Sequence, residues 1–423
     1  MLGKFLKNDF VKSVSVLMTG TVFSQVINYA FTPVLSRIYS VEEMADLNLF
    51  FRITGFIIGF ATLRYEMSLP LPKHDYHSFL LYRVAVKIAI YTMVLVGIVG
   101  LVYIFSQPFS WFNIWFLAFV VIGSIFSIMI NLGTNWSIRN NTFHLISQSR
   151  IINALSSNVL RLFLGLIHWG SFGLLLGTVV GYVVSSWRFL KEYLNRKNDC
   201  QHAHSKAKQY VLVKEYKQFP LINMPHSLSD LGRDLALASL IVLFYGKETF
   251  GHYSYTILIL NIPIAIIGVA ISQAFFNKAS KDSNEGKSIY PLVKKGLTSL
   301  FLISIIPFTI LYFFSEQIFV IVLGEKWRMA GIYASALVLY NFFNFLTAPL
   351  GSLALILNRQ KEFFISALIN SVGQILVVAC SFYLLHWENQ DFIRVLWLLA
   401  VFQSVMMLVN IVLYLHYSKK GKK

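Results

Sequence analysis

Basic side chains lie inside long apolar segments of the sequence, where an ionised group is costly unless it faces water, a ligand or a partner. Neither Arg52 nor Arg161 has an acidic residue within one helical turn along the chain. A guanidinium group binds a phosphate through paired hydrogen bonds. The two unpaired arginines therefore predict a shared cationic cavity that binds a phosphorylated group.

Two further basic positions allow more than one interpretation. Arg233 is flanked by Asp230 and Asp234, so a structural ion pair and a ligand-binding role are both open. The same two aspartates are the candidates for ion coupling. Lys87 follows Arg83 by one turn near the end of an apolar segment, and it either reaches towards lipid headgroups or binds the substrate.

Amide side chains form polar stripes at helical spacing within the apolar segments. Gln25 and Asn28 lie three residues apart, and Asn48 lies one turn before Arg52. Interhelical hydrogen bonding is the preferred interpretation of these amides, and substrate binding is the alternative. The same residue types recur at helical spacing in two later segments, as Asn153 and Ser157, and as Ser366, Asn370 and Gln374.

The elements that carry these residues are predicted to be membrane-spanning helices. Of the 423 residues, 56% are hydrophobic and 13% are charged, whereas a soluble domain has about 25% charged residues. A span needs about 20 mostly apolar residues. Twelve segments qualify: 14–35, 46–63, 84–105, 112–132, 146–167, 171–190, 219–244, 253–275, 293–314, 330–356, 363–385 and 393–416.

The distribution of basic residues predicts the orientation of these spans. Most of the 36 lysines and arginines fall on the side of the N-terminus, which the positive-inside rule places in the cytoplasm. Both termini and the polar stretch 191–218 are therefore expected to be cytoplasmic. The first apolar run is too long for a cleaved signal peptide. The net charge of +17 makes anionic lipid a candidate partner, rather than nucleic acid.

The same polar stretch divides the chain into two predicted halves. Six spans in 1–190 precede the linker 191–218, and six in 219–416 precede a basic tail at 417–423. A short internal repeat aligns Tyr39–Asn48 with Tyr245–Ser254. It predicts halves related by a pseudo-two-fold axis along the membrane normal, as in some transporters. Five prolines could bend the spans: Pro33, Pro225, Pro263, Pro307 and Pro349.

Several enzyme and metal-site patterns are missing from the sequence. There is no phosphate-binding Gly-x-x-x-x-Gly-Lys loop, and the loops predicted outside the cell are short, so neither an ATP-driven pump nor a glycan-building enzyme is expected. Cys200, His202 and His204 are interpreted as part of a solvated linker, because no further ligands follow at zinc spacing. No metal, cofactor or catalytic residue is predicted.

Two runs near the N-terminus, TPVLSRIYSVEEMADLNLF and ATLRYEMSLPLPK, resemble the polysaccharide-biosynthesis flippases, the O-antigen and capsule repeat-unit exporters of the Wzx type. Further similar runs are FPLINMPHSLSDLGRDLALASLIVLFYGKETFGHYSY and LGEKWRMAGIYASAL. This family shares a superfamily with MATE multidrug exporters and peptidoglycan lipid flippases. Ala45 departs from the family, which usually has glycine there, while Gly251 keeps glycine at the repeat position.

The resemblance implies a substrate and a location. The substrate would be an undecaprenyl-diphosphate-linked oligosaccharide, turned from the cytoplasmic to the periplasmic leaflet of a bacterial inner membrane by alternating access. A polysaccharide polymerase and a chain-length regulator would be partners in lipopolysaccharide or capsule assembly. A cation-coupled MATE-type exporter of small molecules is the alternative, with Asp46, Asp230 and Asp234 as its candidate carboxylates. A membrane scaffold within a polysaccharide assembly complex is a further alternative.

Overall fold

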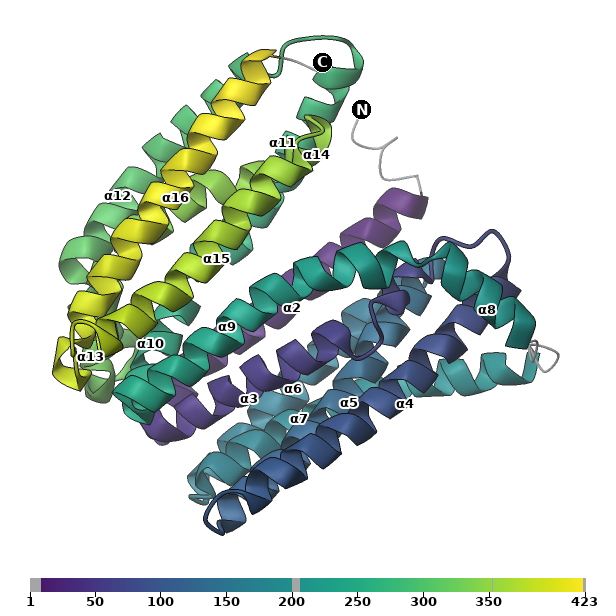
Figure 1. Ribbon diagram of the computed structural model, residues 1–423, viewed down its shortest axis with the longest axis horizontal. Helices are drawn as coiled ribbons and strands as arrows, with labels where there is room; N and C mark the ends of the chain where they lie inside the picture. Colours follow the sequence, from purple (N-terminus) through teal and green to yellow (C-terminus); the bar gives the residue numbers. More distant parts are fainter. Residues whose placement is uncertain (1–8, 200–205, 352, 421–423) are drawn as a thin grey trace. The chain divides into compact units, whose positions relative to one another are not determined.

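A computed structural model describes residues 9–199, 206–351 and 353–420. Within these ranges the chain is helical throughout and contains no strand (Figure 1). This confirms the prediction of an all-α membrane fold. The long helices are α2 (Asp9–Ile38), α3 (Val41–Phe60), α4 (Asp75–Phe105), α5 (Trp111–Arg139), α6 (Phe143–Leu166), α7 (Gly170–Asp199), α9 (Met224–Tyr245), α10 (Lys247–Leu260), α11 (Val269–Asn284), α12 (Tyr290–Leu323), α13 (Arg328–Thr347), α15 (Gln360–Tyr383) and α16 (Phe392–Lys420).

Nine of the twelve predicted spans follow one long helix each to within a few residues. Of the other three, 219–244 begins in a π-helical turn before α9, 253–275 is divided between α10 and α11, and 330–356 runs from α13 through a 3-10 turn into α14 (Leu353–Ile356). Within the described ranges, seven helical segments are long and apolar enough to cross a membrane, which makes the chain a multi-pass membrane protein. They contain α4, α5, α7, α12, α13, α15 and α16. Helices α3, α6 and α9 carry Arg52, Arg161 and Arg233.

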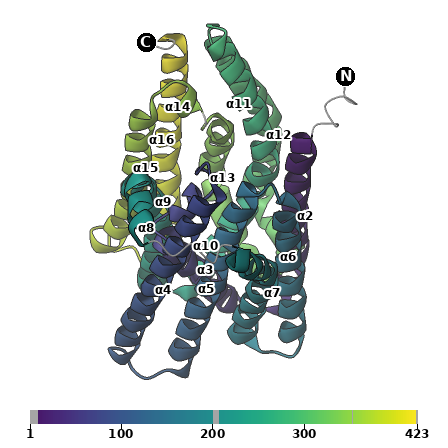
Figure 2. The same ribbon diagram turned by 90° about the vertical axis from the view of Figure 1, so that its right-hand side faces the viewer.

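The chain forms two compact units, Met1–Leu235 and Ala236–Lys423, which meet within α9. In the first unit α6 packs against α2 and α7, and α5 packs against α3, α4 and α7 (Figure 2). In the second unit α13 packs against α10, α12 and α16, and α15 packs against α16. The predicted halves at 1–190 and 219–416, and the axis relating them, stay predictions.

The repeat motif occupies equivalent turns in the two units. Tyr39 and Tyr245 are 2% and 0% exposed, and each lies two residues before the first residue of a helix, α3 or α10. Ala45 and Gly251 follow at the same spacing and are also buried. Gly246 has φ +88°, a left-handed conformation that favours glycine, and it begins α10. The two motifs therefore share a buried aromatic ring and a small buried residue at matching places.

Helix breaks coincide with some of the predicted proline positions. Pro263 and Pro349 lie where α10 and α13 end: a π-helical turn, Ile264–Gly268, follows α10, and a 3-10 turn, Ala348–Leu350, follows α13. Pro225 lies in the first turn of α9, after another π-helical turn at Phe219–Asn223. Pro33 and Pro307 instead lie inside continuous helices, α2 and α12.

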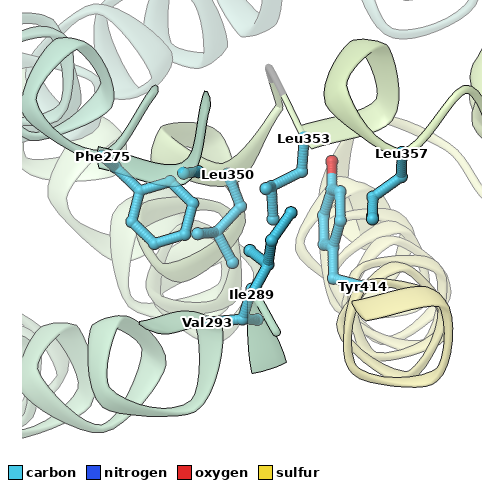
Figure 3. Close-up of a cluster of buried hydrophobic side chains, with 8 residues drawn as sticks. Phe275, Ile289, Val293, Leu350, Leu353, Leu357 and Tyr414 are labelled. Carbon is cyan, nitrogen blue, oxygen red and sulfur yellow. The ribbon is translucent and has the colours of Figure 1, made fainter. Parts of the chain in front are cut away.

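One hydrophobic cluster holds the ends of several helices together in the second unit (Figure 3). It combines side chains from α11, from the start of α12, from α16 and from the short helix α14 (Leu353–Ile356) with its flanking turns. Close packing of this kind is the main attraction between helices surrounded by lipid. The members of the cluster are Phe275, Ala279, Ile289, Val293, Leu350, Leu353, Leu357 and Tyr414.

Candidate functional site

A network of four charged side chains joins α3 to the first half of α9. Nη1 of Arg52 lies 2.8 Å from Oδ2 of Asp234. The other oxygen of Asp234 accepts hydrogen bonds from Nε and Nη2 of Arg233, at 3.1 and 3.0 Å. Asp230 is more distant, with 3.6 Å between its Oδ1 and Nη1 of Arg233. One carboxylate thus bridges two guanidinium groups, and a second carboxylate lies beside them.

Arg52 is therefore not unpaired, because another helix supplies its acidic partner. Asp234 lies 182 positions later in the chain, so the spacing of residues around Arg52 could not reveal it. Asp230 and Asp234, the carboxylates predicted to neutralise Arg233, do contact it, and Asp234 also forms an ion pair with Arg52. The network has two positive and two negative groups and is balanced in charge.

The network is accessible rather than enclosed. The side chains of Arg52 and Asp234 are 31% and 32% exposed, and that of Asp230 is 53% exposed. Gly59 on α3 faces Leu231 on α9, and a Cβ atom at Gly59 would lie 2.5 Å from Cδ1 of Leu231. The arrangement presents charges on α3 and α9 that a ligand can reach.

Arg161 belongs to a separate and more buried cluster. Its side chain donates through Nε and Nη2 to the hydroxyl of Thr178, at 3.1 and 2.6 Å, and through Nη1 to Oδ1 of Asn158, at 3.3 Å. The guanidinium carbon lies 5.8 Å from the centre of the Phe51 ring. Gly177 lets α7 approach α6 at this point. These contacts are those of a structural arginine, and a cavity shared with Arg52 stays a prediction.

The predicted amides have different surroundings. Asn28 accepts a hydrogen bond of 2.7 Å from Nδ2 of Asn158, which links α2 to α6 and to the Arg161 cluster. Gln25 lies half-buried one turn earlier on α2. Asn48 donates to the carbonyl of Met44 in its own helix, at 2.8 Å. Interhelical bonding thus describes Asn28, while Asn48 is bonded within α3.

Lys87 lies away from both clusters. It is exposed on α4, and its Nζ donates to Oε1 of Gln209 at 3.1 Å. Gln209 is part of α8 (Lys206–Glu215), which forms in the second part of the predicted linker. Cys200, His202 and His204 lie outside the described residues.

The sequence interpretation missed Glu66, which is 0% exposed. Its Oε2 accepts from the hydroxyl of Thr62, and its Oε1 lies 3.3 Å from Nδ2 of Asn131 and 3.4 Å from Nη1 of Arg64. Arg64 adopts φ +62°, a strained conformation for a residue with a side chain. The sequence Leu63-Arg64-Tyr65-Glu66 could have indicated this residue, because it places a carboxylate close to an arginine within an apolar region.

Arg150 was also missed as a residue of the polar stripe on α6. The sequence interpretation placed it among the cytoplasmic basic residues, but it lies two turns inside α6. Its Nη1 donates to the hydroxyl of Thr21 on α2. The signal was its spacing, because Arg150 precedes Asn153 and Ser157 on the same polar stripe.

Solved structures of transporters share this fold. An inward-facing multidrug resistance MATE family transporter of the MOP superfamily has 12% identity and a TM-score of 0.67, with 97% of this chain and 99% of that chain covered. The Lipid II flippase MurJ in an inward closed conformation has 16% identity and a TM-score of 0.71, covering 96% and 88%. The MATE multidrug transporter DinF-BH has 16% identity and a TM-score of 0.63, covering 97% and 94%.

The sequence itself matches one protein-family model. No curated protein sequence matches the chain significantly. The family is described as polysaccharide biosynthesis protein, and its model matches residues 58–331, from the end of α3 into the start of α13. This match covers more than half of the chain and includes Arg161, Arg233 and Asp234. The chain is a member of this polysaccharide biosynthesis protein family.

Proposed function

We propose that the chain is a flippase for undecaprenyl-diphosphate-linked oligosaccharide repeat units of O-antigen or capsule type. It would move them from the cytoplasmic to the periplasmic leaflet of a bacterial inner membrane. Membership of the polysaccharide biosynthesis family and a fold shared with a Lipid II flippase support this proposal. The observation that carries it is the pair of accessible guanidinium groups, Arg52 and Arg233, held on one carboxylate.

A diphosphate is a suitable replacement for the bridging carboxylate. Asp234 presents one oxygen to each arginine, and a diphosphate also presents anionic oxygens to two donors, with more charge. Guanidinium groups bind such oxygens through paired hydrogen bonds. In the proposed exchange, the headgroup displaces Asp234 from Arg52, and the α3–α9 contact loosens. The boundary between the two compact units falls within α9. A movement of α9 at Asp234 would therefore be transmitted along the same helix to the residues after Leu235.

The membrane potential would favour outward movement of this headgroup. With the cytoplasmic side negative, each negative charge that crosses outwards gains about 2.3 kcal/mol per 100 mV. The cytoplasmic position of both termini, supported by the distribution of basic residues, gives the protein the orientation this direction requires. A polymerase and a chain-length regulator would use the exported units, and anionic lipid would contact the basic cytoplasmic segments.

The rival function is cation-coupled export of small molecules, favoured by the extent of the MATE similarity. That mechanism needs a carboxylate free to exchange a proton or sodium ion. Asp234 is engaged by two arginines, and buried Asp46 accepts a 2.6 Å hydrogen bond from the hydroxyl of Ser171. Asp230 also lies 3.6 Å from Nη1 of Arg233, so both carboxylates of the network are engaged by arginines.

Reconstitution in liposomes tests the proposal. Purified protein is inserted with a fluorescent lipid-linked oligosaccharide, and the fraction of glycan that reaches the opposite leaflet is measured with a membrane-impermeant glycosidase. We expect protein-dependent translocation of the lipid-linked glycan. Export of a cationic dye driven by a proton or sodium gradient, without glycan translocation, would support the rival function instead.

A further inference from the structure

A polar cavity of about 250 Å³ lies inside the first unit and is lined by α2, α5, α6 and α7. All but one of its lining side chains carry a hydroxyl, an amide, a phenol or a guanidinium group. Two larger cavities in the same unit, of about 420 and 500 Å³, are lined almost entirely by apolar side chains and suit lipid chains. The smaller cavity therefore suits a ligand with many hydrogen-bonding groups.

Arg150 supplies the positive charge of this cavity, and no carboxylate contributes to its lining. Its Nη1 is bonded to the hydroxyl of Thr21. The described residues provide Arg150 with no ion-pair partner. The residue lies seven positions from the start of α6, about 10 Å along the helix axis. Arg150 is half-buried, and a half-buried cation without a carboxylate partner is costly, so an anionic group in the cavity would be stabilised.

Hydrogen bonds orient the amides around the cavity. Nδ2 of Asn153 donates to the hydroxyl of Ser185 at 3.2 Å, which leaves its carbonyl oxygen as an acceptor for a ligand. Oδ1 of Asn28 accepts from Asn158 at 2.7 Å, which leaves its amino group as a donor. Tyr182 adds an aromatic side chain to the wall. A few oriented polar groups beside an aromatic ring are typical of a small-molecule site.

We propose that this cavity binds one pyranose ring that carries a carboxylate, such as a hexuronic acid residue of the transported glycan. The carboxylate pairs with Arg150, the ring hydroxyls bond to Asn28 and Asn153, and the ring lies beside Tyr182. The inference rests on the proposed function and extends it by giving the glycan, and not only the diphosphate, a charged subsite. The Arg52 network and this cavity then hold different parts of one substrate.

Equilibrium binding to the purified full-length protein tests the inference by calorimetry. The probes are methyl β-D-glucuronide, neutral methyl β-D-glucoside and inorganic phosphate. We expect saturable binding of the glucuronide, with the glucoside at least about tenfold weaker because it lacks the charged partner of Arg150. Arg150→Gln should remove this preference, and Arg150→Lys should retain part of it. Arg188→Gln, which changes an exposed arginine on α7, should bind the glucuronide as the wild type does.

A second variant keeps the test decisive if Arg150→Gln does not fold. Asn153→Asp places a carboxylate beside Arg150 and should abolish the preference for the charged sugar. Equal binding of glucuronide and glucoside, an unchanged preference in Asn153→Asp, or stronger binding of phosphate than of glucuronide would overturn the inference. The liposome assay tests the proposed function separately. A protein that binds the glucuronide but translocates no lipid-linked glycan would contradict the proposed function and leave the sugar-binding inference standing.

Discussion

Arg52 on α3 and Asp234 on α9 form an ion pair of 2.8 Å, although 182 residues separate them in the chain. The same carboxylate holds Arg233 through its other oxygen. Asp234 therefore links the two helices, and in the proposed mechanism it is the group that the anionic substrate displaces.

If Arg52 binds the diphosphate, its charge and geometry control transport. Arg52→Ala should lower the rate of glycan translocation about 10- to 150-fold, the range expected for a lost charge-assisted hydrogen bond, at unchanged membrane abundance. Arg52→Lys should keep part of the activity, because the charge remains. Arg37→Ala, at an exposed arginine on α2, is the control. Normal translocation by Arg52→Ala at wild-type abundance would contradict the assignment.

The two aspartates of the network should differ in their effect on stability. Asp234→Asn leaves Arg52 without its carboxylate and Arg233 with only the more distant Asp230, and it should lower the free energy of unfolding by about 1–3 kcal/mol. Asp230→Asn should cost less than about 1 kcal/mol, because this carboxylate is more exposed and lies 3.6 Å from Arg233. Thermal unfolding in detergent measures both variants. A larger loss in Asp230→Asn would show that Asp234 does not bridge the helices.

Arg161 is expected to act through stability rather than through substrate contact. Arg161→Ala removes three hydrogen bonds to Thr178 and Asn158 and leaves their oxygens buried. We expect a loss of about 2–4 kcal/mol, seen as lower abundance in the membrane and a lower unfolding temperature. Translocation per inserted molecule should change little. A stable Arg161→Ala protein with no translocation would instead assign this arginine to the substrate.

The contact between Gly59 on α3 and Leu231 on α9 can be tested by substitutions that leave every charge in place. Gly59→Ala adds a Cβ atom 2.5 Å from Cδ1 of Leu231, the movable end of a half-buried side chain, and should destabilise the protein by no more than about 1 kcal/mol. Leu231→Ala in the same protein should restore much of that loss by making room. Gly55→Ala is the matched control, since nothing lies within 4 Å of its Cβ position. Additive effects of Gly59→Ala and Leu231→Ala would argue against this contact.

Membrane topology can be measured directly. A reporter enzyme active only in the cytoplasm should be active when fused after Lys423 or Asp199, and inactive when fused after Glu388. The basis is the excess of basic residues on the side of both termini. Activity at all three positions would contradict an even number of spans with cytoplasmic termini.

The amino-acid sequence by itself determined the helical membrane fold, because the length and apolar character of a span are local properties. The backbone hydrogen bonds of each helix join residues four apart, and each polar stripe, such as Asn153, Ser157 and Arg161, can be read within one segment. The tertiary structure alone decided which stripes face one another. In the folded protein Arg52 forms an ion pair with Asp234, Arg161 donates hydrogen bonds to Thr178, and Arg150 lines a polar cavity. Contacts between helices depend on packing across long stretches of chain, for which the spacing within one helix carries no information.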